Sequence, residues 1–465
     1  MNQQVFLLWA NLVFPEGIAP GEDRDSNSIT IARNGQGMAL LRGTSLAGAL
    51  RSAYRTSHSE YETNLWFGRA LDSGDDKSQD SLLKVPDIVL NTGQANVQIR
   101  THNAINRHTG SVIEGGLFSI EVLPPGTGGI CLMEICDNSA YQLNEANKFI
   151  QELTDILSSG LSLGGNRNRG IGRMMIDGHI HYAQFDLTTL NSYADWLDSR
   201  YRYLRDSEMP VGDVINPQST QNRYVLEFNL NIPRGEDFVV GYGATMDYTL
   251  EPQIVTNHNG QSFWRIPGSS LRGIFRAWMT RLAARDGAPV CDSAEAFHSG
   301  KHEIKGDNLG WAFVSSSERK AYRDHPDSLD DPILSLFGSL YARGRIHFSD
   351  AFSSMPATDN RESVHVRKHV AIDRFSGGAN EGMLFTNKVL VASNTLFCCR
   401  IEIDNPTELE IDWIVKTLKA LHLGVLSVGS SKGSGRIKLH SIQSVSESHR
   451  SVAENLTCFL EAHHE

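Results

Sequence analysis

Two stretches of this sequence match closely although they lie far apart in the chain. Residues 40–51 read L-L-R-G-T-S-L-A-G-A-L-R, and residues 265–276 read R-I-P-G-S-S-L-R-G-I-F-R. Gly43 and Gly268 occupy equivalent positions, 225 residues apart. The same short motif of glycine, hydroxyl side chains and leucine therefore stands in both halves of the chain, which indicates an internal repeat.

Three further blocks recur in the same order. The second block reads W-F-G and then L-F-G, the third runs from a histidine to L-F, and the fourth is rich in glycine and ends in G-R; they begin at Trp66 and Leu336, at His102 and His369, and at Leu161 and Leu426. The distance between the copies rises from 225 residues at the first block to 270 at the second, and then stays between 263 and 267. This jump predicts an insertion in the second copy, at about 286–331.

Each copy has the same predicted order of secondary structure. An apolar strand opens it, at 5–13 and at 224–232, and a helix follows the first motif. Two further strands, a second helix and a last strand complete the order β-α-β-β-α-β, which is typical of a ferredoxin-like fold. We therefore predict an α+β chain of two tandem ferredoxin-like (RRM-like) domains. One face of each sheet is expected to stay open to a ligand.

The predicted domains cover residues 1–182 and 223–465. The linker between them, at 183–222, contains an aromatic-rich segment at 190–205 that we predict as a helix. A turn-prone P-V-G-D-V-I-N-P segment follows this helix.

Composition limits the possible classes of protein. The chain has 465 residues, of which 40% are hydrophobic, and this fits a globular protein. No stretch approaches the roughly 20 apolar residues that span a bilayer, so we expect no membrane contact. Six cysteines without a C-x-x-C pair predict reduced thiols and a cytoplasmic protein. The net charge of −11 excludes attraction of nucleic acid over the whole surface but not at a local basic groove.

Four motifs of the second copy, taken together, resemble those of one family. They are the helix-start motif at 266–276, L-F-G followed by G-R-I-H-F-S-D-A-F at 344–352, I-D-R at 372–374 and the closing G-S-G-R. This combination resembles the RAMP superfamily of CRISPR proteins, and more narrowly the backbone subunits of type III effector complexes. Two such domains in one chain resemble the fused subunits of type III-D systems. The first copy matches more loosely, with Asn106 in place of the aspartate of I-D-R.

The resemblance implies a function and partners. Such subunits cradle a guide RNA (crRNA) on the ferredoxin-like domain and push a hairpin thumb into the duplex of guide and target RNA. Copies stack along the guide, together with a large polymerase-like subunit and small helical subunits. In these subunits an acidic residue on the first loop cleaves the target RNA.

Candidate RNA-binding residues lie at the helix starts, in the glycine-rich blocks and in the predicted hairpins. Glycine lets the main chain approach a phosphate, helix N-termini attract anions, and arginine and lysine neutralise the backbone. The candidates are Gly43, Thr44, Ser45, Arg51, Arg107, Arg167, Arg169, Arg173, Ser269, Ser270, Arg272, Arg276, Lys368, Arg374, Lys432 and Arg436. The hydroxyl side chains are also expected to cap their helices, and the glycine-rich blocks could be ordinary turns.

The hairpins predicted at 100–118 and 367–385 combine cations with apolar residues such as Val112, Ile113 and Met383. A wedge of this kind could separate RNA bases, although a long hairpin could equally contact another subunit.

Candidate catalytic residues are carboxylates in the first loop of each copy. RNA can be cut by its own 2′-OH, and a carboxylate can accept that proton or hold a divalent ion, Mg²⁺ being the expected one. We favour Asp25 and Asp247, with Asp23 and Glu251 as alternatives. An acidic loop without any catalytic role would have the same composition.

Other functions and sites remain open at this point. The chain could be a purely structural subunit without cleavage, or a guide-processing endoribonuclease of the same superfamily. The second of these should carry one glycine-rich block, whereas this chain has two. Cys291, His298 and His302 lie in the insertion, but the lack of a second cysteine nearby favours surface histidines over a zinc site.

Overall fold

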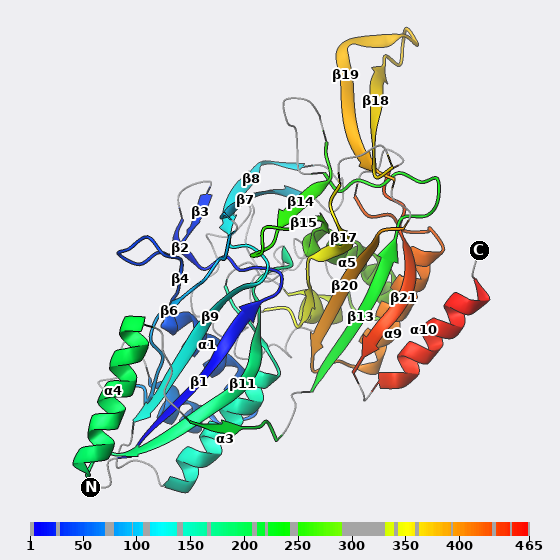
Figure 1. The fold of residues 1–465 in the computed structure, drawn as a ribbon. Helices are drawn as coiled ribbons and strands as arrows, with labels where there is room; N and C mark the ends of the chain where they lie inside the picture. The colour runs from blue at the N-terminus through cyan, green and yellow to red at the C-terminus, as the bar shows by residue number, and fades with distance from the viewer. Residues whose placement is uncertain are drawn as a thin grey trace, which may run out of the picture. The chain divides into compact units, whose positions relative to one another are not determined.

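The computed structural model divides the chain into two compact units (Figure 1). Unit 1 comprises Met1–Arg167, Ile171–Gln221 and Thr256–Gln261, and unit 2 comprises Asn168–Gly170, Asn222–Val255 and Ser262–Glu465. The structure describes residues 4–24, 28–69, 79–94, 96–105, 112–136, 143–164, 169–206, 212–218, 222–241, 250–290, 331–338, 343–358, 362–391, 394–429, 434–446 and 449–463.

The main sheet of unit 1 has the strand order of a ferredoxin-like domain. β1 (Gln4–Phe14) pairs antiparallel with β11 (Arg173–Asp186) on one side and with β9 (Thr127–Cys136) on the other. β5 (Leu83–Lys84) pairs with β9. The first strand of the repeat thus lies between the last strand and the third, and the second strand lies beside the third, as a β-α-β-β-α-β chain requires.

Three helices cover one face of this sheet: α1 (Gly43–Tyr54), α2 (Glu60–Phe67) and α3 (Leu143–Ser158). Their apolar side chains, such as Leu50 and Phe149, form one buried cluster with the inward-facing residues of β1. The remaining strands of unit 1 are β2 (Gly21–Arg24), β3 (Ser28–Ile31), β4 (Leu40–Leu41), β6 (Ile88–Val89), β7 (Gln98–Ile105), β8 (Val112–Val122), β10 (Leu161–Ser162) and β12 (Asp213–Ile215).

The opposite face of the unit 1 sheet is covered by α4 (Leu190–Asp206). Leu7 and Trp9 point to this face, where they are buried in a cluster with Tyr203 and in contact with Trp196. The expectation of an open sheet face is therefore wrong for unit 1. The physical reason is that β1 is apolar on both faces, so both must be removed from water. The helix predicted in the linker is α4, and it packs on this sheet.

Unit 2 repeats the strand order of unit 1. β13 (Arg223–Asn231) lies between β21 (Lys438–Val445) and β20 (Leu396–Asp404), and β16 (Ile346–Phe348) pairs with β20. The prediction of two tandem ferredoxin-like domains is thereby confirmed. The other elements are β14 (Gln253–Thr256), β15 (Ser262–Ile266), β17 (Ala351–Pro356), β18 (Val364–Ile372), β19 (Ala379–Leu390), α5 (Gly268–Arg285), α8 (Pro332–Phe337), α9 (Glu408–His422) and α10 (Arg450–Ala462).

The core of unit 2 forms because β13 alternates. Tyr224, Leu226 and Phe228 are buried in one cluster with residues of α5 and α9, whereas Glu227 points to the other face. The predicted insertion falls between α5 and α8, and residues 291–330 lie outside the described part of the chain.

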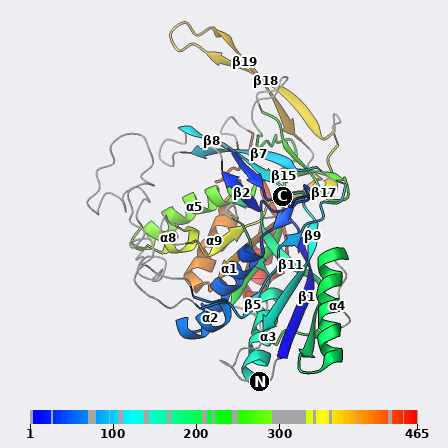
Figure 2. The same ribbon diagram turned by 90° about the vertical axis from the view of Figure 1, so that its left-hand side faces the viewer.

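Each unit carries a long antiparallel hairpin, formed by β7 and β8 in unit 1 and by β18 and β19 in unit 2. Both views show β18–β19 extending away from the sheet of unit 2 (Figures 1 and 2). Among the described residues, no helix is long and apolar enough to cross a membrane.

Candidate nucleic-acid interface

The starts of α1 and α5 are capped by aspartates from other parts of the chain. The Gly43 N–H donates to Asp87 Oδ1 at 2.8 Å, and the Gly268 N–H donates to Asp350 Oδ1 at 2.9 Å. Neither helix has a side-chain cap from its own first residues. The expectation that the adjacent hydroxyl groups cap these helices is therefore wrong. A carboxylate carries a full negative charge, so it satisfies the free N–H and the helix dipole better than a hydroxyl.

The two helix-start glycines are required by close packing. A Cβ atom at Gly43 would lie 1.9 Å from the Val85 carbonyl oxygen, and one at Gly268 would lie 2.3 Å from that of Phe348. Real carbon–oxygen contacts are never so short, so no larger residue fits. This packing explains the repeated glycine without any ligand. RNA contact by Gly43 and by the hydroxyl residues Thr44, Ser45, Ser269 and Ser270 stays a prediction.

Arginines of the two helices bind the second repeated block of their own unit. Arg51 donates to the Gly68 carbonyl at 2.9 Å and to the Asn64 side chain at 2.6 Å. Arg272 donates to the Phe337 carbonyl, and its guanidinium lies 5.5 Å from the centre of the Phe337 ring. These contacts tie W-F-G and L-F-G to the preceding helices, and RNA binding by Arg51, Arg272 and Arg276 stays a prediction.

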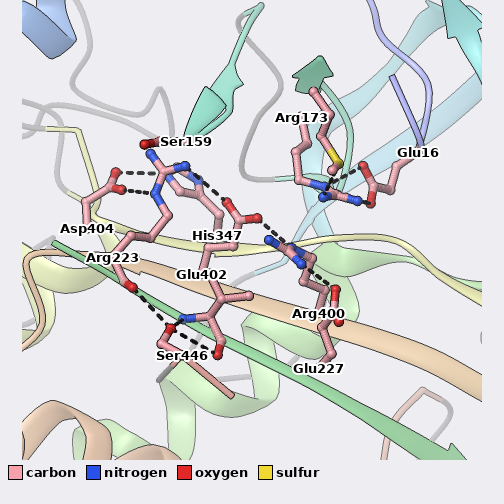
Figure 3. Close-up of polar contacts among 12 residues, drawn as sticks. Glu16, Ser159, Arg173, Arg223, Glu227, His347, Arg400, Glu402, Asp404 and Ser446 are labelled. Atoms are coloured by element: carbon pink, nitrogen blue, oxygen red, sulfur yellow. Dashed lines mark hydrogen bonds and ion pairs between the residues drawn. The ribbon is translucent and has the colours of Figure 1, made fainter. Parts of the chain in front are cut away.

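The arginine that closes each glycine-rich block pairs with a glutamate from the loop after the first strand. Arg173 contacts both carboxylate oxygens of Glu16, at 2.7–3.2 Å, and the pair is nearly buried (Figure 3). Arg436 pairs with Glu236 at 3.1 Å. The repeated arginine thus anchors the block to its own domain. Arg169 lies in the part of the block that belongs to unit 2, and Arg167 and Lys432 lie outside the described residues.

Both hairpins hold the same stacked pair of rings. His102 stacks on Phe118 across β7 and β8 with 5.5 Å between ring centres, and His369 stacks on Phe385 across β18 and β19 with 5.2 Å. The sequence analysis does not name these ring pairs as candidates. The repeat could have indicated them, because each copy of the third block begins with the histidine and ends with the phenylalanine.

The outer part of the β18–β19 hairpin exposes cations and apolar side chains together. Lys368 and Arg374 are exposed, and the Phe375 side chain at the tip is fully exposed. Asp373 holds the turn, since its Oδ1 accepts hydrogen bonds from the Phe375 and Ser376 N–H groups at 2.9 and 2.7 Å. These backbone hydrogen bonds lower the pKa of the Asp373 carboxyl. The exposed apolar set is Val366, Val370, Ile372, Phe375, Met383 and Leu384.

The first hairpin can be compared only in part. Arg107 lies outside the described residues, and the side chains of Val112 and Ile113 are not described.

The outer face of the unit 2 sheet carries a network of ion pairs (Figure 3). Arg223 pairs with Asp404 at 2.7 Å, Arg400 pairs with Glu402 at 2.6 Å, and Arg400 also contacts Glu227. These charges compensate one another within unit 2. The outer sheet faces of the two units therefore differ. In unit 1 a helix covers apolar residues, and in unit 2 the face carries ion pairs.

The candidate catalytic loops lie largely outside the described residues. This holds for Asp25 and Asp247. Asp23 belongs to β2, where its backbone is opposite Thr30, and its side chain is not described. Glu251 is partly buried just before β14. In the described part of the chain, no group of three His, Cys, Asp or Glu side chains could hold a metal ion.

Two ferredoxin-like units, each with a repeated hairpin and a glycine-rich block, define a tandem protein of the RRM-like class. The model of the RAMP superfamily matches residues 20–175 and 248–438, which is more than half of the chain. The chain belongs to the RAMP superfamily, as its motifs indicated. No curated protein matches it. Family membership supports a CRISPR-associated, RNA-binding role with RNA and CRISPR-complex partners.

Proposed function

We propose that this protein is a guide-RNA-binding backbone subunit of a type III CRISPR effector complex. The observation that carries the proposal is that both hairpins contain the same stacked histidine–phenylalanine pair, which supports two equivalent RNA-binding hairpins in one chain. A guide-processing endoribonuclease would need only one such device. The proposed partners are guide RNA, target RNA, a large polymerase-like subunit and small helical subunits.

The chemistry of the β18–β19 hairpin fits an RNA strand. Lys368 and Arg374 can neutralise phosphates locally although the whole chain is acidic. Phe375 offers a ring on which a base can stack, and Met383 and Leu384 extend the apolar surface. A hairpin that exposes a ring and cations to water is stabilised when an RNA covers them.

We further propose that the chain cleaves the bound target RNA. Asp25 and Asp247 would each accept the proton of a 2′-OH as that oxygen attacks the adjacent phosphorus and the 5′-oxygen leaves. Mg²⁺ is the proposed ion, since carboxylates suit it and it would stabilise the developing negative charge. A structural subunit without cleavage is the alternative.

RNA binding by the hairpin predicts a specific dependence on salt. The double variant Lys368→Ala, Arg374→Ala is expected to bind a fluorescent single-stranded RNA roughly tenfold more weakly at moderate salt. Two lost phosphate contacts should also reduce the slope of log K against log[salt] by about 1.4. Fluorescence anisotropy at several salt concentrations measures both effects.

Lys148→Ala is the matched control, because Lys148 is an exposed lysine of α3. Equal losses in the double variant and in the control would contradict binding at the hairpin. RNA that copurifies with the protein from its native host should contain CRISPR repeat sequence, and its absence would argue against a guide-binding role.

Phe375→Ala is expected to weaken RNA binding without affecting the fold. Stacking of one base on an aromatic ring contributes about 1–3 kcal/mol, which corresponds to roughly 5- to 150-fold in affinity. The ring is fully exposed, so its loss removes no internal packing. Tyr61→Ala, which removes an exposed ring from α2, serves as the control. An unchanged affinity of Phe375→Ala would exclude stacking on this ring.

A further inference from the structure

Unit 1 contains a hollow of about 700 Å³, and every residue that lines it belongs to this unit. It lies at the end of the sheet face that α4 covers. Asn11 continues the row of Leu7 and Trp9 along β1, but Asn11 is exposed whereas the other two are buried. Binding sites for small ligands commonly have volumes of about 300–1,000 Å³. The hollow is therefore large enough for a ligand of the size of a nucleotide.

Two polar side chains from neighbouring strands line this hollow. Asn11 of β1 and Asp177 of β11 are direct cross-strand partners. The register of the two strands shifts beside them, and Gly178 has a φ of +88° with nothing within 4 Å of a Cβ. Irregularities of this kind redirect side chains and are common next to binding sites. Among the described residues, no group donates a hydrogen bond to the Asp177 carboxylate.

A cation lines the same hollow. Arg33 lies in the turn between β3 and β4, and its Nη1 donates to the Gly37 carbonyl at 2.9 Å. This bond uses one of the five N–H groups of the guanidinium. In the described part of the chain, Arg33 pairs with no carboxylate, and this includes Asp177. A ligand that fills the hollow must therefore bring donor groups to Asp177 and negative charge to Arg33.

An imidazole ring forms another part of the wall. His258 belongs to the segment 256–261 of unit 1. Its N–H donates to the Pro125 carbonyl at 2.8 Å, and its carbonyl accepts the Gln94 N–H at 2.9 Å. A Cβ atom at Gly126 would lie 1.9 Å from His258 Nδ1, so the ring packs in a place that only a glycine leaves open. Histidine is one of the side chains on which RNA bases stack.

We propose that this hollow binds a guanosine nucleotide. The Watson–Crick edge of guanine carries two neighbouring N–H groups, and the Asp177 carboxylate, which only accepts, can accept both. Adenine and cytosine present one amino group beside a ring nitrogen that is an acceptor, so they satisfy a carboxylate less well. Arg33 neutralises the phosphate. The inference rests on the proposed RNA-binding function and adds selectivity for one base to it.

Selectivity for guanine tests the site. The full chain, stripped of copurified RNA at high salt, is titrated with GMP and with AMP by calorimetry. Two labelled oligouridines, one with a single central guanosine and one with a single central adenosine, are compared by fluorescence anisotropy. The wild type is expected to prefer guanine by roughly 5- to 150-fold, the discrimination typical of a bidentate contact to a base. The first pair reports a free nucleotide, and the second reports a base within an RNA strand.

Variants assign the preference to the two charged residues. Asp177→Asn replaces an acceptor oxygen with a donor, so the preference for guanine should disappear. Arg33→Ala should lower the affinity for GMP to that of guanosine, because only the phosphate contact is lost. Asp195→Asn is the matched control, since Asp195 is an exposed carboxylate of α4 that does not line the hollow. Circular dichroism checks that all variants are folded.

Equal affinity for guanine and adenine in both pairs would overturn the proposal, and so would a preference that survives in Asp177→Asn. An oligouridine without guanosine is titrated on the same protein. Its binding reports RNA binding as such, so a failure of guanine selectivity is distinguishable from a failure of the proposed function.

Discussion

Asp350→Ala is expected to lower the free energy of unfolding by about 3–5 kcal/mol, because removing one partner of a buried ion pair leaves the other charge uncompensated. Asp350 is paired with the buried Arg265 and also accepts the first N–H of α5. Arg265 would lose its only charged partner among the described residues, keeping a hydrogen bond to Gln253, and the Gly268 N–H would lose its acceptor, both in a buried place. The substitution therefore costs charge compensation and a helix cap at once.

The equivalent change in unit 1, Asp87→Ala, serves as the internal comparison. Asp87 makes the same two contacts, but its ion pair with Arg42 is exposed, so we expect a cost of no more than about 1–2 kcal/mol, chiefly from the lost cap. Hydrogen exchange of the full chain, followed by mass spectrometry of peptides from α1 and α5, measures the two effects locally. Similar costs at the two positions would show that burial does not determine the contribution of these aspartates.

The double variant Asp25→Ala, Asp247→Ala is expected to reduce cleavage of target RNA at least 100-fold in the assembled complex. A positioned proton acceptor typically contributes 10²- to 10⁴-fold, and the alanines remove the proposed acceptor in both copies. Binding of the target should change little, because the proposed hairpin contacts are intact. Cleavage of a labelled target RNA under single-turnover conditions, with binding measured in parallel, separates the two steps.

Asp412→Ala provides the control, since Asp412 is an exposed carboxylate of α9 whose partner is Lys416. Cleavage that persists in the double variant would shift the assignment to Asp23 or Glu251, and each of these is then tested in the same way. A wild-type complex that binds the target but does not cut it would support the purely structural alternative.

Much of the fold could be predicted because local patterns specify it. The second helix predicted for the second copy is α9, which begins after Thr407 with a capping box formed with Glu410. The alternation in β13 indicates one buried and one polar face, as observed. That a helix covers the second face of the unit 1 sheet could also have been predicted. The run V-F-L-L-W in β1 has no alternation, and such a strand needs apolar partners on both sides.

The candidate site was less predictable because its key contacts join distant residues. Phosphate contact by the repeated arginines Arg173 and Arg436 stays a prediction, but the structure also pairs them with Glu16 and Glu236. Nothing in the spacing of a glutamate and an arginine more than 150 residues apart indicates such a pair. The two stacked ring pairs depend on the strand register, which places each histidine across from its phenylalanine.

By itself, the sequence determined the duplication, the ferredoxin-like order of each copy and the family, because these depend on patterns that recur along the chain. Only the tertiary structure decided which carboxylates cap α1 and α5, and that Gly170 packs against Asp350. Those outcomes depend on strand pairing, which brings Asp87 and Asp350 to helix starts 44 and 82 residues away. Contacts between such distant positions leave no periodic trace in a single sequence.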